Sequence, residues 1–348
     1  MIFTVRTDAS DIIGFGHLYR SIAFSLKIKK SNDQIYLVSK ELPSYLKNWL
    51  KNLEVEFFII PQHIRVGSLE DLYFTKQIIK DLGKIDLLIV DSYSIDQKWE
   101  SKIKSFVNKI LVIDDLANRK HNCDFLIDQN LRFNVNRYSG LVSNKTKVFL
   151  GPKYAFLRDE FYSKKPFNRI RKEVNNILIF MGGGDNNYEI KKILKVINII
   201  KFKSLNWTLI IGKNNRELNQ IIKISRNIKN LKLIEHIEEI SNLIFEADLA
   251  IGTCGISAWE RCLSGLPTLV FITAENQKED AIILDKLNAV KNLGYAENIS
   301  VESIVIQIKE IISNKRILEK MSFASTNILQ GHKEIISEFF YNIRQSLN

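Results

Sequence analysis

The chain has 348 residues, of which 45% are hydrophobic and 26% are charged. This length suits two domains with large buried cores, and the composition is that of an ordinary globular protein. There is no uncharged apolar run of about 18 residues and no signal-peptide layout at the start. We therefore expect a cytoplasmic protein that does not enter a membrane.

The net charge of +11 comes from lysines and arginines that are spread over many predicted helices. We therefore expect no nucleic-acid partner, although a positive field favours an anionic small substrate. The three cysteines, Cys123, Cys254 and Cys262, include no Cys-x-x-Cys pair. This argues against a disulfide framework and a zinc site, and we expect neither a metal nor another cofactor.

Apolar runs alternate with helical patterns along the first half of the chain. This alternation predicts a parallel sheet with helices on both faces. The strand-like runs are 2–5, 35–38, 57–60, 87–90 and 111–113, and the helical patterns include 68–82 and 99–108.

The first strand runs into the turn Gly14-Phe15-Gly16-His17, after which a helical pattern begins. Glycines in such a turn let the backbone approach a ligand, and the N-terminus of the following helix favours negative charge. A histidine in this place can act as a general base near neutral pH. The alternative is a tight turn in which His17 only caps the helix.

Polar residues follow two later strands. Asp91-Ser92-Tyr93 comes directly after 87–90, and Asp114-Asp115 follows 111–113. Because ligands of open α/β sheets gather at the carboxyl ends of the strands, Tyr93 and Asp114 are candidates for lining a pocket. Each is equally a candidate for a helix cap or a turn residue.

The alternation of strands and helices starts again after a connector at 151–166, which is bounded by Gly151-Pro152 and Lys165-Pro166. The strand-like runs there are 176–181, 207–211, 231–234, 249–251 and 268–271, and further helical patterns cover 301–313 and 334–345. The predicted fold is α/β, with two Rossmann-like domains that face a shared cleft. The domains cover 1–150 and 167–325, and a helix within 326–348 can pack back on the first domain.

Two glycine-containing turns of the second half are candidates for phosphate binding. Gly182, Gly183 and Gly184 follow the first strand there, and only glycine lets a backbone come so close to a phosphate. A flexible left-handed turn is the alternative, and no Gly-Lys-Ser/Thr follows to make a Walker loop.

The second turn, 252–255, opens a helix whose N-terminus can receive a diphosphate. Ser257 could donate a hydrogen bond there, and Glu260 could accept two ribose hydroxyls. Alternatively, Glu260 pairs with Arg261 or caps the helix. Further on, the amides of Asn276 and Gln277 suit sugar hydroxyl and acetamido groups, although asparagine is also a good N-cap.

Together these motifs resemble the UDP-2,4-diacetamido-2,4,6-trideoxy-β-L-altropyranose hydrolases of pseudaminic acid biosynthesis. That family is similar in turn to the MurG-type glycosyltransferases, with two Rossmann-like domains in the GT-B arrangement. The matching segments are Arg6-x-Asp8, Gly14-Phe15-Gly16-His17, 87–93, Asp114-Asp115, 151–161, 181–185 and 275–277. The resemblance runs in order to roughly residue 290 and is much weaker beyond it.

The resemblance implies hydrolysis at the anomeric carbon with inversion, releasing UDP and the free 2,4-diacetamido-2,4,6-trideoxy-L-altrose. It makes His17 the base that activates water. The residues that it assigns to the substrate are Arg6, Asp8, Gly14, Phe15, Gly16, Tyr93, Asn276 and Gln277. Those that it assigns to UDP are Gly182, Gly183, Gly184, Ser257 and Glu260. The turn before Ser257 is richer in glycine than the family's serine-rich version, which weakens the assignment of Ser257.

The expected partner is a UDP-linked diacetamido sugar, bound by a monomer. Negative charge that develops on the leaving diphosphate can be stabilised by a helix N-terminus, so the chemistry requires no metal. Three alternatives stay open: a GT-B transferase that uses a UDP-N-acetylamino sugar, a hydrolase of a different UDP-diacetamido sugar, and a nucleotide-sugar-binding protein without catalysis. Fold does not separate them.

Overall fold

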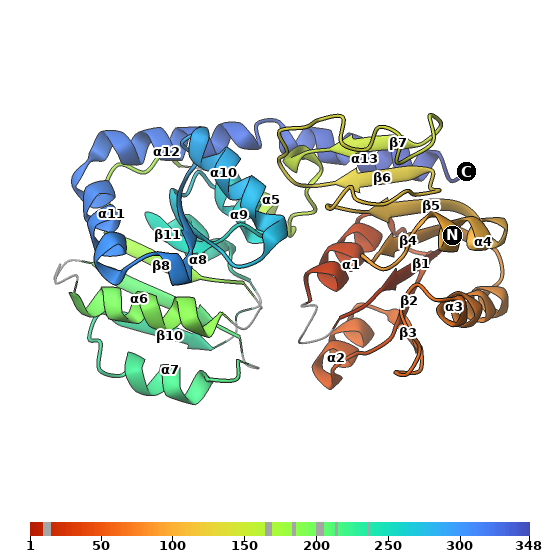
Figure 1. The fold of residues 1–348 in the computed structure, drawn as a ribbon, viewed down its shortest axis with the longest axis horizontal. Helices are drawn as coiled ribbons and strands as arrows, with labels where there is room; N and C mark the ends of the chain where they lie inside the picture. Colours follow the sequence, from red (N-terminus) through yellow and green to blue (C-terminus); the bar gives the residue numbers. More distant parts are fainter. Residues whose placement is uncertain are drawn as a thin grey trace. The chain divides into compact units, whose positions relative to one another are not determined.

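The computed structural model describes residues 1–9, 15–163, 169–182, 186–199, 205–212, 215–235, 237 and 239–348. The chain divides into two compact units (Figure 1). Unit 1 consists of Met1–Asn130, Asn134–Phe156 and His332–Asn348, and unit 2 consists of Leu131–Phe133 and Leu157–Gly331. Each unit is built around its own parallel sheet.

Among the described residues, the sheet of unit 1 has seven strands in the order β3-β2-β1-β4-β5-β6-β7. Their bounds are β1 Ile2–Thr7, β2 Gln34–Ser39, β3 Val55–Ile59, β4 Ile85–Asp91, β5 Val107–Ile113, β6 Phe125–Asp128 and β7 Lys147–Leu150. All neighbours are parallel. The chain turns to one side of β1 to form β2 and β3, and it continues on the other side with β4. This is the kind of switch point at which open α/β sheets bind ligands.

Helices cover both faces of this sheet (Figure 1). Their bounds are α1 Gly16–Ile28, α2 Ser44–Asn52, α3 Leu69–Leu82, α4 Gln97–Ile103, η1 Lys104–Phe106, η2 Pro152–Tyr154 and α13 His332–Gln345. The last helix, α13, belongs to unit 1, where Phe339 packs among Phe24, Phe149 and Phe156. Burial of these rings against α1 joins the end of the chain to its beginning.

The sheet of unit 2 has six described strands in the order β10-β9-β8-β11-β12-β13. Their bounds are β8 Asn176–Phe180, β9 Asn206–Ile211, β10 Leu231–Glu235, β11 Leu249–Thr253, β12 Thr268–Ile272 and β13 Val290–Tyr295. The helices are α5 Glu160–Ser163, α6 Asn187–Ile199, α7 Leu218–Ser225, α8 Ser241–Glu246, α9 Ile256–Leu263, η3 Glu275–Gln277, α10 Lys278–Lys286, η4 Ala296–Asn298, α11 Val301–Ser313 and α12 Lys315–Ile328. The order again changes direction, here between β8 and β11.

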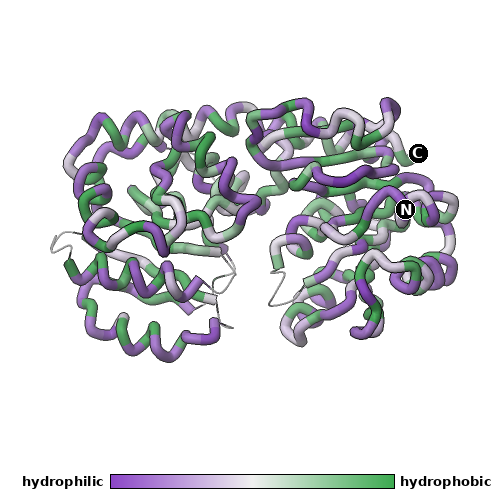
Figure 2. The backbone as a smooth tube through the Cα atoms, viewed as in Figure 1, coloured by the Kyte–Doolittle hydropathy of each residue, from purple (hydrophilic) through white to green (hydrophobic). Residues whose placement is uncertain are grey.

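The predicted fold class, α/β with two Rossmann-like domains, is confirmed by these two parallel sheets. Hydrophobic residues concentrate on the strands of both sheets, whereas the helices carry both kinds of residue (Figure 2). This is the pattern of strands buried on both faces beneath amphipathic helices. The helical pattern at 99–108 corresponds to the end of α4 and to η1, but it extends too far: its last two residues belong to β5, because the chain turns to extended backbone at Val107.

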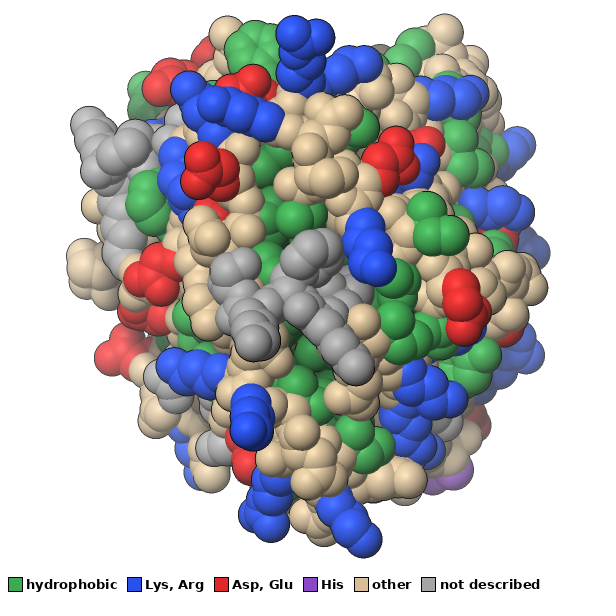
Figure 3. Space-filling view, turned by 90° about the vertical axis from the view of Figure 1, so that its left-hand side faces the viewer, with side chains coloured by type: hydrophobic (Ala, Val, Ile, Leu, Met, Phe, Trp, Pro, Cys, Tyr) green, Lys and Arg blue, Asp and Glu red, His purple; other side chains and the backbone are tan. Residues whose placement is uncertain are grey.

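No helix in the described ranges is long and apolar enough to cross a membrane. On the face drawn in Figure 3, the lysines and arginines lie dispersed among acidic and neutral side chains. They form no continuous basic surface on this face.

Candidate active site

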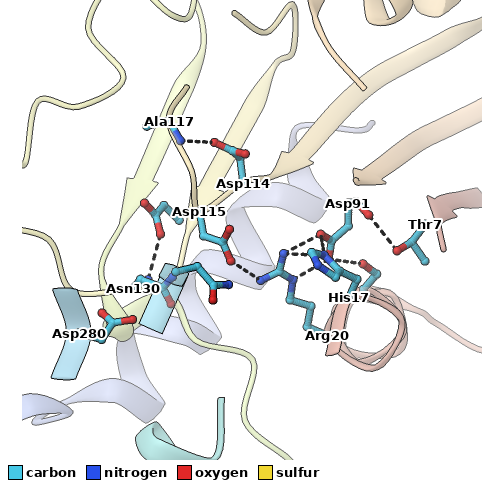
Figure 4. A network of polar contacts seen from close by, with 12 residues as sticks. Thr7, His17, Arg20, Asp91, Asp114, Asp115, Ala117, Asn130 and Asp280 are labelled. Atoms are coloured by element: carbon cyan, nitrogen blue, oxygen red, sulfur yellow. Dashed lines mark hydrogen bonds and ion pairs between the residues drawn. The ribbon is translucent and has the colours of Figure 1, made fainter. Parts of the chain in front are cut away.

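The carboxyl ends of β1 and β4 bring the candidate base and its partner together in unit 1. The register of the two strands pairs Thr7 with Asp91, and the Thr7 hydroxyl donates to the Asp91 carbonyl at 2.9 Å. The helix α1 then begins at Gly16, which places His17 in its first turn. Figure 4 shows the imidazole of His17 beside the carboxylate of Asp91.

His17 and Asp91 form a close pair. The Nδ1 atom of His17 lies 2.6 Å from Oδ1 of Asp91, and the two side chains are 11% and 0% exposed. A proton on Nδ1 that is donated to the carboxylate leaves the lone pair on Nε2. The pair is therefore suited to general-base chemistry, with a buried carboxylate to stabilise the imidazolium that forms.

Asp91 is held in its ionised form by a dense set of donors. Nε and Nη2 of Arg20 each lie 2.6 Å from its carboxylate oxygens, and the Ser21 hydroxyl donates at 2.9 Å. Burial alone would raise the pKa of Asp91, but Arg20 and His17 hold that pKa well below its usual range. Arg20 also binds Asp115 at 3.1 Å, so a single guanidinium joins the ends of β4 and β5 (Figure 4).

The ring of Tyr93 packs against that of His17, the candidate base. Its ring meets the His17 ring edge to face, with centroids 4.7 Å apart and an interplanar angle of 86°. Burial and the nearby Asp115 raise the pKa of Tyr93 far above its usual range. The phenol therefore stays protonated and serves as a hydrogen-bond group rather than as a base.

Asp114, the other strand-end candidate, stabilises a turn. Its carboxylate accepts the Ala117 amide at 2.9 Å and binds Arg119 at 2.7 Å, and its side chain is fully buried. Burial would raise the pKa of Asp114, but Arg119 holds that pKa below its usual range. Of the two roles that the sequence left open, the turn residue fits these contacts.

Arg6 lies beneath the site rather than at its surface. Its guanidinium is fully buried and binds Asp71 at 2.9 Å and Asp8 at 2.9 Å. The predicted substrate contact of Arg6 is not supported, because the side chain offers no exposed surface. Asp8 is 7% exposed and accepts the Lys40 amide at 2.8 Å, which fits support of the carboxyl end of β1.

Of the other residues in the His17 turn, the structure describes Phe15 and Gly16. A Cβ atom on Gly16 would meet no atom of the described residues within 4 Å. Phe15 occupies the N-cap position of α1, with its ring edge to face against Tyr45 at 6.0 Å. Gly14 lies outside the described residues, as do Gly183 and Gly184 in unit 2. Gly182 is described and has φ +84°, in the left-handed region that favours glycine.

In unit 2, a buried arginine supports the turn between β11 and α9. Arg261 donates to the Thr253 carbonyl at 2.6 Å and to the Ser257 hydroxyl at 3.1 Å. A Cβ on Gly252 would lie 2.7 Å from the Phe180 carbonyl oxygen and 3.0 Å from this guanidinium, so only glycine fits there. Since the Ser257 oxygen accepts from Arg261, its hydroxyl hydrogen is directed to another acceptor.

The carboxylate of Glu260 is paired with Arg158 rather than with Arg261. Nε and Nη2 of Arg158 lie 2.8 and 2.7 Å from its two oxygens, in a bidentate contact. The Glu260 side chain is 3% exposed and that of Arg158 is 40% exposed. The alternatives of a pair with Arg261 or a helix cap are therefore wrong. A ribose would share this carboxylate with Arg158 or displace it.

Asn276 and Gln277 lie in the single turn η3. The side-chain carbonyl oxygen of Gln277 accepts from the Thr273 hydroxyl at 3.1 Å. The main-chain carbonyl of Asn276 accepts from Arg132 at 3.2 Å. The turn thus presents its two amide side chains from a fixed backbone.

Sequence reasoning missed Asp91, Arg20, Arg158 and Arg132 as site residues. Asp91 follows an apolar strand and Arg20 follows the histidine at helical spacing, so a signal existed for these two. Within the part of the chain that the structure describes, no group of three or more His, Cys, Asp or Glu is arranged to hold a metal ion.

Comparison with known proteins yields one family model and several relatives. Residues 176–339 match the Glycosyltransferase family 28 C-terminal domain. The UDP-2,4-diacetamido-2,4,6-trideoxy-β-L-altropyranose hydrolase of Campylobacter jejuni is 29% identical over 282 residues, which are 81% of this chain and 95% of that protein. An uncharacterized protein of Methanocaldococcus jannaschii is 28% identical over 80% of this chain, which spans 57% of that protein's length.

Solved structures share the fold at low identity. MurG of Acinetobacter baumannii superposes with a TM-score of 0.65 at 14% identity, over 97% of this chain and 100% of the MurG chain. The protein therefore has the fold of the GT-B glycosyltransferases, and its residues 176–339 match the C-terminal domain of glycosyltransferase family 28.

Proposed function

We propose that this protein hydrolyses UDP-2,4-diacetamido-2,4,6-trideoxy-β-L-altropyranose to UDP and the free sugar, with inversion, in pseudaminic acid biosynthesis. The observation that carries the proposal is the buried Asp91 carboxylate on Nδ1 of His17, with Tyr93 against the same ring. The name of the Campylobacter relative, which aligns over 95% of its length, supports this choice of substrate. More broadly, the match to the family 28 domain supports an enzyme that acts on a UDP-sugar.

In the proposed reaction, Nε2 of His17 takes a proton from a water molecule. The water oxygen forms the new bond to the anomeric carbon on the face opposite the leaving group, and the bond between that carbon and the diphosphate oxygen breaks. The electron pair of the broken bond leaves with UDP. Asp91 stabilises the imidazolium, because its carboxylate is buried and already ionised.

The leaving diphosphate is assigned to the N-terminus of α9. Backbone amides of its first turn, together with the Ser257 hydroxyl, stabilise the charge that develops on UDP. Glu260 accepts the ribose hydroxyls, while Tyr93, Asn276 and Gln277 contact the sugar. The protein acts as a monomer without a metal or cofactor.

The test is an assay of the purified protein with this UDP-sugar, EDTA and ¹⁸O-labelled water, followed by mass spectrometry. We expect UDP together with free sugar that carries ¹⁸O at the anomeric carbon. Label on UDP instead would mean cleavage at phosphorus and would contradict the mechanism. UDP release that requires an added acceptor would identify a transferase.

Two further outcomes separate the remaining alternatives. Turnover of another UDP-diacetamido sugar, but not of this one, would keep the mechanism and change the substrate. Binding of UDP without turnover of any such sugar would identify a nucleotide-sugar-binding protein. A matched His17→Asn variant should bind UDP normally and lose most turnover.

A further inference from the structure

A short segment of the β6–β7 connection belongs to unit 2. Leu131–Phe133 lies in sequence between two strands of unit 1, yet it is part of the compact body formed by Leu157–Gly331. At its centre is Arg132, whose side chain is only 7% exposed. A buried arginine is costly unless its donors are used, so its contacts show what the segment does.

The guanidinium of Arg132 holds the start of α10 and the turn before it. Nη1 lies 3.0 Å from Oδ1 of Asp280, a carboxylate that is 1% exposed, and Nε lies 3.7 Å from Glu279. Nη2 donates to the main-chain carbonyl of Asn276 at 3.2 Å. The Phe133 amide adds a bond of 2.8 Å to Glu279, so the segment is fixed by its main chain as well.

The turn that receives this contact is held by its own backbone bonds and by contacts from outside. The element η3 is a single 3-10 turn, and its N-cap residue Ala274 makes no side-chain capping bond. Such short turns have poor internal hydrogen-bond geometry. Gln277 is tied back to Thr273, whereas the Asn276 carbonyl is held by Arg132. A charge-assisted bond at that carbonyl sets the direction in which the Asn276 side chain leaves the backbone.

We propose that Arg132 is a positioning residue for sugar recognition: it orients Asn276 toward the acetamido and hydroxyl groups of the substrate. The inference rests on the proposed function, in which Asn276 contacts the sugar. The planar guanidinium reaches the Asp280 carboxylate and the Asn276 carbonyl together. A lysine ammonium, a compact point charge, would keep the ion pair with Asp280 and lose the second contact.

The experiment compares Arg132→Lys with wild type in the full chain. We expect KM for the UDP-diacetamido sugar to rise about tenfold, the equivalent of one well-aligned hydrogen bond. The dissociation constant for UDP should not change, because UDP lacks the diacetamido sugar that Asn276 is assigned to contact. Unchanged UDP binding also shows that unit 2 is folded. A matched control is Lys286→Gln, since the Lys286 ammonium lies 4.7 Å from the ring of Phe133, the residue that follows Arg132.

A double-mutant cycle with Asn276→Ala then separates positioning from general support. If Arg132 acts through Asn276, the Arg132→Lys change adds nothing to KM in the Asn276→Ala background. An additive effect, or an equal loss of UDP affinity, would overturn the inference. Should Asn276→Ala raise KM while Arg132→Lys does not, the inference alone fails. If Asn276→Ala itself leaves KM unchanged, the sugar contact assigned under the proposed function fails, and the inference fails with it.

Discussion

At the scale of single residues, the suitability of His17 as a base depends on the charge of its neighbour Asp91. Asp91 is fully buried, but it is ionised because Arg20 and His17 stabilise its charge. Such a carboxylate fixes which nitrogen of His17 carries the proton and lowers the cost of forming an imidazolium. The chemistry assigned to His17 on α1 therefore depends on Asp91 at the end of β4.

The first prediction concerns that neighbour. Asp91→Asn keeps the side-chain volume and removes the charge, so Nε2 of His17 loses basicity and the ring loses its fixed orientation. We expect kcat to fall about 10²- to 10⁴-fold, the range of a general base. Steady-state turnover of the UDP-sugar measures this, with UDP binding as the check on folding. Because the pair acts as a unit, the His17→Asn/Asp91→Asn double variant should be little worse than either single variant. A kcat within a factor of two of wild type would rule out the pair as the base.

The second prediction concerns Arg158 and Glu260. The bidentate contact orients a carboxylate that has almost no exposed surface, and that orientation suits an acceptor of two hydroxyls. We expect Arg158→Gln to weaken UDP binding about tenfold, since Glu260 would lose its alignment and its compensating charge. Isothermal titration with UDP checks this. Tighter binding would show instead that Arg158 competes with the ribose.

At the scale of elements, the pattern of apolar residues predicted most of the strands, including the edge strands β3 and β10, but it did not predict β6, β7 or β13. The pattern at 68–82 corresponds to α3 (Leu69–Leu82), which is long and opens on the N-cap Ser68. No pattern indicated β6 or β7, because each has only four residues. β13 was missed because it is a polar edge strand that contains Lys291, Asn292 and Gly294. Short elements of this kind owe their conformation to the sheet that they join.

The third prediction belongs to α13, which begins at a buried histidine. Nε2 of His332 lies 3.0 Å from the Ala155 carbonyl oxygen, and burial lowers the pKa of His332 from 6.5 to about 4. The unfolded chain therefore takes up a proton at higher pH than the folded one. The titration of His332 therefore leaves the free energy of unfolding unchanged above about pH 6.5. As the pH falls toward 4, it lowers this free energy by at most about 3 kcal/mol.

In a variant that lacks the His332 titration, stability should depend less on pH. His332→Gln keeps an amide donor for Ala155 and has no group that titrates in this range. Thermal unfolding between pH 4 and 7 should thus show a smaller acid loss than wild type. His63, which is exposed, supplies the matched control His63→Gln. An identical pH dependence in wild type and His332→Gln would remove His332 as its source.

At the scale of the whole molecule, the sequence was sufficient for the fold class, and it pointed to His17 as the candidate base. It did not indicate the contacts that support the site. Nothing in the chain order states that β1 and β4 are neighbours, so the partnership of His17 with Asp91 appears only once the sheet is assembled. Arg132 and Asn276 are separated by 144 positions, and no periodic pattern connects them. Such contacts depend on the topology of the sheets and on where the chain leaves one unit for the other.

The last prediction follows from the charge of the whole chain. A net charge of +11 produces a positive field, which raises the local concentration of an anionic nucleotide sugar. Salt screens this attraction over a distance of about 8 Å at physiological ionic strength. We expect KM for the UDP-sugar to rise severalfold between about 0.01 M and 0.15 M sodium chloride. The value of kcat should be nearly constant, because the buried contacts of Asp91 are screened much less. A series of assays with a neutral crowding agent in place of salt separates the effect of ionic strength on KM from an effect of viscosity. A fall in kcat with salt at constant KM would contradict this prediction. It would mean that salt weakens the ion pairs around His17 rather than the attraction of the substrate to the protein.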